Sequence, residues 1–202
     1  MDLDGLRVWR EDLRHAAASA LLGFETRYGY PPGENGISPP DPAGTARLAA
    51  VDTIPQDLLL LYRAVGGIDL PDVGNGFFLH TASHIARFHE SRQLRHVRGG
   101  HHADVLVFAS DGGGTQYALD TPTGVPVYRL PPAAVIDGTY TSDDPQFGPA
   151  APDLATFLGG LLNAVEAFAA SGTPPQLQET GPPRQGPRAC QGVTSQAGSS
   201  EA

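Results

Sequence analysis

Residues 105 to 120 constrain the fold more than any other stretch, because they have the pattern of two strands joined by a tight turn. Val105 to Ala109 is a continuous run of β-branched, aromatic and other apolar residues, typical of a central strand covered on both faces. Gly112-Gly113-Gly114 then supplies a turn, after which Tyr117 and Leu119 alternate with other residues. The pattern predicts a β-hairpin at the centre of a sheet.

Further strands are expected on both sides of this hairpin. Residues 77–79 follow the turn signal Asn75-Gly76, and a second turn at residues 121–124 leads into the alternating apolar residues of 125–130. We therefore expect a small antiparallel meander.

Four segments have helical periodicity. Apolar residues recur every three or four positions over residues 6–28 and again, most regularly, over residues 154–168. A shorter helix is predicted from Pro55 to Val65, with Gly66-Gly67 ending it in the left-handed conformation. Weaker periodicity predicts a further helix over residues 83–97.

These elements predict a single α+β domain, with a mostly antiparallel mixed sheet flanked by N-terminal, middle and C-terminal helices. Residues 1–45 are expected to form the N-terminal helix and a Pro/Gly-rich loop at 30–45, packed as one unit with the main domain at 46–172. Residues 173–202 are Thr, Pro, Gln, Gly and Ser with few apolar side chains. We expect a disordered tail there, because such a segment buries too little surface to offset its ordering entropy.

The composition excludes several kinds of chemistry. All 13 basic residues other than histidine are arginines, which excludes a Walker A loop and Lys Schiff-base chemistry. Cys190 is the only cysteine, so there is no intrachain disulfide and no cysteine zinc cluster. The net charge of −9 argues against nucleic-acid binding and favours either a basic protein partner or simply solubility. We expect no cofactor.

The start of the chain and its apolar runs predict a cytoplasmic protein that does not bind membranes. Met1-Asp2-Leu3-Asp4 is acidic where a secretory signal would be basic. Uninterrupted apolar runs such as Leu58 to Leu61 are far shorter than the roughly 18 residues that a membrane span requires.

Several motifs follow one another in a characteristic order between about residues 46 and 170. They are Ile54-Pro55-x-x-Leu58, Tyr62-x-x-x-Gly66-Gly67, the run from Val107 to Asp120, and Asp153-Leu154-x-x-Phe157-Leu158. This order resembles the SMI1/KNR4, or SUKH, family, most specifically in the part from Phe108 to Asp120. It departs from that pattern in having Val65 before Gly66-Gly67, where the family commonly has asparagine.

The resemblance implies a mixed sheet with surrounding helices that serves as a protein-binding scaffold. Most often such a domain is an immunity protein that neutralises a polymorphic bacterial toxin by direct binding, and a fungal branch acts as a cytosolic regulatory scaffold. Both roles need no catalytic residue. A third alternative, from a different class, is a hydrolase that uses His and Asp side chains of the central hairpins, which would require a pocket where the two come within hydrogen-bond reach.

The triple glycine is interpreted as a turn and not as a phosphate-binding loop. The pattern G-x-G-x-x-G is not met, and the segment leads into a strand where a phosphate site needs a helix. The functional alternative is that Gly113 and Gly114, which lack a Cβ, let the backbone of a partner approach closely.

Six of the seven histidines lie between His80 and His102. His80 and His84 have the spacing of a helical metal pair, but Thr81 or Ser83 is expected to cap the helix and leave His80 outside it, so we predict no metal site. The arginines of this stretch form a basic patch that is either a solvated helix face or a contact for an acidic partner or a phosphate. They are Arg87, Arg92, Arg95 and Arg98, against Glu90 alone.

Four aspartates near the hairpin turns are the most interesting acidic residues. Asp69 and Asp72 bracket Pro71, and Asp111 and Asp120 flank the central hairpin, where they are either turn-forming residues or paired carboxylates for acid–base work. If the hairpins lie side by side, the four would form a negative surface that steers a basic toxin, such as a nuclease. The predicted partner-binding residues are Asp69, Asp72, Asp111, Gly113, Gly114, Tyr117 and Asp120, and no catalytic residue is predicted.

Overall fold

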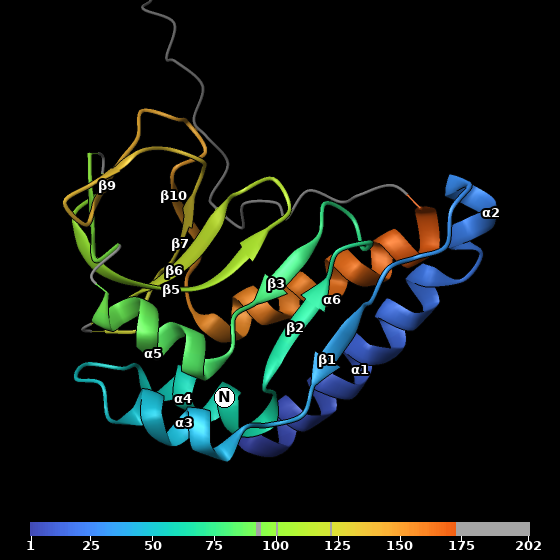
Figure 1. Cartoon of the computed structure of the whole chain (residues 1–202), viewed down its shortest axis with the longest axis horizontal. Helices are drawn as coiled ribbons and strands as arrows, with labels where there is room; N and C mark the ends of the chain where they lie inside the picture. The colour runs from blue at the N-terminus through green and yellow to red at the C-terminus, as the bar shows by residue number, and fades with distance from the viewer. Residues whose placement is uncertain (92–93, 100, 122, 173–202) are drawn as a thin grey trace, which may run out of the picture.

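A computed structural model describes residues 1–91, 94–99, 101–121 and 123–172 (Figure 1). The helices are α1 (Leu3–Leu21), α2 (Phe24–Tyr28), α3 (Pro42–Ala49), α4 (Gln56–Ala64), α5 (Ala82–Glu90) and α6 (Leu154–Ser171). The strands are β1 (Gly36–Ser38), β2 (Gly67–Leu70), β3 (Phe77–Leu79), β4 (His96–Arg98), β5 (Ala103–Asp111), β6 (Gln116–Asp120), β7 (Val127–Leu130), β8 (Val135–Ile136), β9 (Thr139–Thr141) and β10 (Gly148–Ala151). The expected tail at 173–202 and Arg92 of the basic patch lie outside the described residues.

The strands form one mixed sheet centred on β5. Along one edge β5 pairs with β3 near Asp111 and with β4 near Ala103, and along the other edge it pairs with β6. The sheet continues through β2 and β1 on one side, through β7 and β10 on the other, and through β9 and β8 beyond β4. Within the described part of the chain, β4 and β9 are the only parallel pair. These pairings confirm the predicted α+β class and its mostly antiparallel mixed sheet.

Both faces of β5 are covered, as its unbroken apolar run predicts. Leu106 and Phe108 belong to the main hydrophobic core, whereas Val105 and Val107 belong to a second, smaller core on the other face. The register Val105↔Asp120 to Ser110↔Gln116 confirms the hairpin, with a β-bulge between Val107 and Ala109. This hairpin therefore separates the two cores.

The helices α1 and α6 cover the main core together. Figure 1 shows them running side by side, with α6 behind β2 and β3. The indole N–H of Trp9 in α1 donates a 3.0 Å hydrogen bond to the carbonyl of Leu158 in α6. The predicted helix at 154–168 is confirmed, with Asp153 as its N-cap and Gly172, at φ 67°, as its C-cap.

One helix among the described residues, α6, is long and apolar enough by composition to cross a membrane. A third of this helix is buried inside the described structure. Six of its side chains are buried, most of them against the sheet and α1: Leu154, Phe157, Leu158, Leu161, Val165 and Phe168.

The N-terminal region differs from its sequence pattern in two places. The periodicity over 6–28 predicts one helix, but α1 ends at Leu21 and the chain turns at Gly23, where φ is 69°, before α2 begins. The segment 30–45, predicted to be a loop, contains β1 and the start of α3. Spacing of apolar residues does not reveal a break of two residues, and three residues are too few for a strand pattern.

The role of Gly66-Gly67 also differs from the prediction, because neither glycine has a left-handed φ. Val65 is already extended, Gly66 donates its N–H to the carbonyl of Ser38, and Gly67 begins β2. A Cβ on Gly66 would collide with the carbonyl oxygen of Pro39. The glycine is therefore required for close approach of β1 and not for ending the helix.

The prediction of a helix over residues 83–97 is correct only for the first half of that range. Thr81 is its N-cap and accepts a 3.2 Å hydrogen bond from the N–H of His84, so His80 lies outside the helix as expected. The helix ends at Glu90, and residues 96–98 form β4.

Candidate functional site

Asp72 is occupied in holding the N-terminal loop. Its Oδ2 accepts hydrogen bonds of 2.7 Å from the backbone N–H of Gly33 and from the side-chain amide of Asn35. Its own N–H donates to the Oδ1 of Asn35 at 3.2 Å. Asp72 therefore forms an internal clasp between the β2–β3 turn and the segment before β1, and its contact with a partner stays a prediction.

Asp111 and Asp120 both stabilise their own turns. Oδ1 of Asp111 accepts from the N–H groups of Gly113 and Thr115, each at 2.9 Å. Oδ1 of Asp120 accepts from the N–H and the hydroxyl of Thr123. Of the two interpretations, turn formation is what these contacts support.

The four aspartates do not form one surface. Asp111 is opposite Phe77 in the sheet, whereas Asp120 is opposite Val105, six residues back along β5. At about 3.3 Å per residue the two ends are separated by about 20 Å. Asp69 is exposed on β2, three residues before Asp72. The structure thus brings Asp72 and Asp111 to one end of the sheet and leaves Asp120 at the other.

Gly113 and Gly114 lie in the exposed turn between β5 and β6. The backbone that approaches this turn most closely belongs to the chain itself, since the N–H of Gly112 donates a 2.9 Å hydrogen bond to the carbonyl of Asn75. Gly114 has φ 85°, which only glycine adopts without strain. These features give Gly112 and Gly114 a role within the fold, and the close approach of a partner's backbone to Gly113 and Gly114 stays a prediction.

A pocket of about 440 Å³ lies at the same end of the sheet, between the β2–β3 turn and the C-terminal half of α6. Its volume is in the range of small-ligand sites. Its apolar wall includes Val73, Phe77, Leu161, Val165 and Phe168. Its polar groups come from Asp111, Tyr117, Arg129 and Gln146. Two of the predicted residues, Asp111 and Tyr117, thus meet in one concave site.

Arg129 also lines this pocket, although the sequence pattern did not single it out. It is opposite Tyr117 in the β6–β7 ladder, so the two side chains project from the same face. Its Nε is buried and without an acceptor, and its guanidinium forms no hydrogen bond or ion pair with any residue that the structure describes. A buried N–H without a partner is costly, which marks this group as one that a ligand could satisfy.

Tyr117 lies between a positive and a negative group. The pKa of its phenol is raised to about 12, mainly by burial and in smaller part by the nearby Asp111 carboxylate, whereas Arg129 acts in the opposite direction. The phenol therefore stays protonated at neutral pH and is a hydrogen-bond donor. Its hydroxyl has no hydrogen-bond partner among the residues of known position.

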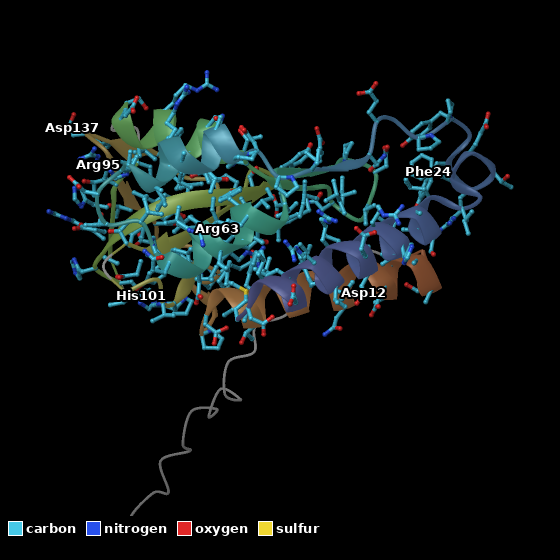
Figure 2. The ribbon with its side chains drawn as sticks, turned by 90° about the horizontal axis from the view of Figure 1, so that it is seen from below. Asp12, Phe24, Arg63, Arg95, His101 and Asp137 are labelled. Atoms are coloured by element: carbon cyan, nitrogen blue, oxygen red, sulfur yellow. The ribbon has the colours of Figure 1, made fainter. Side chains whose placement is uncertain are left out.

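A second hollow, of about 520 Å³, brings a histidine and an aspartate together on the β4–β5 hairpin. Nδ1 of His96 lies within hydrogen-bond distance of Oδ1 of Asp104. Arg95 also lines the hollow, and its guanidinium donates a 3.0 Å hydrogen bond to the carbonyl of His89. Figure 2 shows Arg95 at the end of the molecule opposite Phe24.

The residues that the structure describes contain no group of three or more His, Cys, Asp or Glu side chains able to hold a metal ion. His80 and His84 do lie together, with ring centroids 5.0 Å apart. Burial lowers the pKa of His80 to about 4, and the proximity of His84 contributes to this shift.

No family model, curated protein or solved structure matches this chain. The resemblance to SMI1/KNR4 proteins accordingly rests on the motifs themselves and stays an expectation.

The pocket could have been found only in part from the sequence. Tyr117 was identified through its place in the hairpin, but Arg129 is one arginine among thirteen and has no neighbouring motif. Its importance comes from strand pairing with Tyr117 and from the cover that α6 provides. Neither contact is local in sequence.

Proposed function

We propose that this domain is a non-catalytic protein-binding module whose partner docks over the pocket between the β2–β3 turn and α6. The observation that carries the proposal is Arg129, a half-buried arginine whose buried Nε–H has no acceptor in the described chain and which lines a pocket that also has an apolar wall. Interfaces are commonly anchored by a few residues that fill such pockets, and arginine is enriched among them.

The resemblance to SMI1/KNR4 proteins supports a more specific role, that of a cytoplasmic immunity protein that binds a toxin. The charge of the chain favours a basic toxin domain, such as a nuclease. Because Asp72, Asp111 and Asp120 each use an oxygen internally, we expect their charges to act through the long-range field more than through direct contacts. Asp69 is exposed and available for contact.

The proposal is tested by identifying the partner and then blocking the mouth of the pocket. Proteins that co-purify at stoichiometric yield are identified and purified, and the affinity of each for the domain is measured by calorimetry. Gln146 lines the pocket and is exposed, so Gln146→Trp should obstruct docking and weaken binding about tenfold or more. Asp143→Trp lies in the same loop outside the pocket and is the matched control, expected to bind as the unmodified chain does.

Two results would refute this proposal. In one, Gln146→Trp binds a stoichiometric partner as tightly as the control does. In the other, the purified chain turns over a small molecule at an ordinary enzymatic rate. For the toxin role, co-expression with the identified partner should rescue growth of cells that the partner alone kills, and the Gln146→Trp variant should not rescue them.

A hydrolase is the second candidate, and the His96–Asp104 pair favours it. Such a pair holds an imidazole in one tautomer for acid–base work. However, the side chains of His96 and Asp104 are 45% and 61% exposed, so water is not excluded from them. Activity towards ester or phosphodiester substrates that His96→Gln abolishes would establish this alternative over the binding module.

A further inference from the structure

We infer that the pocket between the β2–β3 turn and α6 binds a carboxylate that adjoins an apolar side chain, the chemistry shared by the C-terminal residue of a peptide and a free amino acid. The inference deepens the proposed function, since it names the contact that a partner would make there. It is nevertheless testable on the domain alone.

The anionic end of the ligand is assigned by Arg129 and Tyr117. An arginine fork matches a carboxylate in geometry, and a charge-assisted hydrogen bond is about twice as strong as a neutral one. The buried Nε–H of Arg129 lacks an acceptor, and the protonated hydroxyl of Tyr117 is a second donor beside it. A carboxylate placed between them would satisfy both groups at once.

The opposite end of the ligand is assigned by Asp111. Its Oδ1 is held by the N–H groups of Gly113 and Thr115, which fixes the carboxylate in place. Its Oδ2 accepts no hydrogen bond from any residue in the described ranges. It is therefore able to accept an N–H from a peptide bond or an ammonium group. One arginine and one aspartate give the pocket no net charge, which favours a monoanion with a donor over a doubly charged phosphate.

The apolar part of the ligand is assigned by the wall of the pocket. Leu161, Val165 and Phe168 of α6 face Val73 of the β2–β3 turn across a space of about 440 Å³. Burying an aliphatic side chain the size of leucine against such a wall strengthens binding about tenfold or more. Specificity for leucine-like or aromatic residues follows from this wall and not from the polar groups.

The test uses three small probes and nuclear magnetic resonance on the intact chain. Acetyl-leucine has the carboxylate and the peptide N–H, acetyl-leucinamide lacks the carboxylate, and free leucine has an ammonium group. We expect acetyl-leucine to bind with a dissociation constant on the order of 1 mM and to shift the resonances of Val73, Arg129 and Leu161. Acetyl-leucinamide should bind about tenfold more weakly.

Variants assign the contacts. Arg129→Leu should weaken acetyl-leucine binding about tenfold or more, whereas Arg98→Leu, an exposed arginine on β4 that does not line the pocket, should not change it. Asp111→Asn keeps an oxygen for the turn and should weaken the binding of free leucine more than the binding of acetyl-leucine. If free leucine binds more tightly than acetyl-leucine, the natural ligand of the pocket is a free amino acid. The reverse order indicates the C-terminus of a peptide.

Equal binding of acetyl-leucine and acetyl-leucinamide would overturn the inference, and this comparison needs no variant to fold. Absence of binding by all three probes would overturn it as well. Either result leaves the proposed protein-binding function standing if the Gln146→Trp experiment succeeds. Conversely, if the pocket binds carboxylates but no protein partner is found, the protein-binding role is overturned and the inference that the pocket binds a carboxylate stands.

Discussion

The carbonyl oxygen of Asn75 accepts a hydrogen bond from the N–H of Gly112, and a Cβ on Gly112 would overlap that oxygen. This contact joins the β2–β3 turn to the β5–β6 turn. It sets the distance between the two segments that supply Val73 and Asp111 to the pocket. The triple glycine thus serves the packing of two turns against each other.

We expect Gly112→Ala to destabilise the fold by about 1–3 kcal/mol, because backbone must move to make room for the methyl group. Gly159→Ala is the matched control. A Cβ there meets nothing within 4 Å and lies in α6, so alanine should stabilise by about 1 kcal/mol through helix propensity. Urea unfolding followed by circular dichroism measures both. Equal stability of Gly112→Ala and the unmodified chain would show that the turns are not in contact.

Because Asp72 holds two segments of the chain together, we expect its replacement to lower the stability of the fold. Asp72→Ala removes the acceptor for Gly33 and Asn35 and should cost about 1–3 kcal/mol. Asp69→Ala, on the exposed face of β2, should change stability by less than about 0.5 kcal/mol. Thermal unfolding of the two variants makes the comparison. A smaller loss for Asp72→Ala than for Asp69→Ala would contradict the clasp.

The lowered pKa of His80 predicts that the folded protein loses stability on mild acidification. Its pKa falls from about 6.5 in the unfolded chain to about 4 in the folded protein, because the half-buried ring is costly to charge. Between these values the unfolded chain binds more protons, so stability is fully present above pH 6.5 and declines as the pH falls towards 4. The measurement is the urea midpoint at pH 7 and pH 4.5.

His80→Gln should make the urea midpoint less dependent on pH over this range. The backbone of His80, and not its ring, makes the hydrogen bonds to Phe108 and Tyr62, so the substitution leaves those bonds in place. His102→Gln, at an exposed position, is the control and should keep the full pH dependence. The same pH dependence in His80→Gln and in the unmodified chain would mean that His80 is not the group responsible.

Long, regular patterns in the sequence predicted their elements well. The strand β5, its hairpin with β6, and the helix α6 follow from apolar runs or periodicity that extend over at least five residues. The short strands β1 and β8 have three and two residues, too few for a pattern, and exist because the neighbouring strands offer them hydrogen-bond partners. The break at Gly23 likewise has no signal beyond a single glycine.

The candidate site was less predictable than the fold. Aspartates beside glycine were correctly expected at turns, but the sequence could not show that Asp72 bonds to Asn35, 37 residues away. Nor could it show that Asp120 lies at the far end of the hairpin from Asp111, because that depends on register. Arg129 gains its place from pairing with Tyr117 and from the cover of α6, both of which are long-range contacts.

Trp9 offers a test of whether the N-terminal helix belongs to the same folding unit as the rest of the domain. It is the only tryptophan, it packs against the main core, and its indole N–H donates to the carbonyl of Leu158 in α6. Five side chains of α1 are buried in that same core. A shared core unfolds cooperatively, so the fluorescence of Trp9 and the far-ultraviolet circular dichroism should lose their native signals at one urea concentration.

The hydrogen bond itself is tested by Trp9→Phe, which keeps an aromatic ring in the same place but has no N–H donor. We expect a loss of about 1 kcal/mol, read from circular dichroism because the fluorophore is gone. In the unmodified chain, a fluorescence transition at lower urea than the circular dichroism transition would show α1 detaching first. Residues 1–45 would then be a separate, weaker unit, and the contact between α1 and α6 would not be part of the cooperative core.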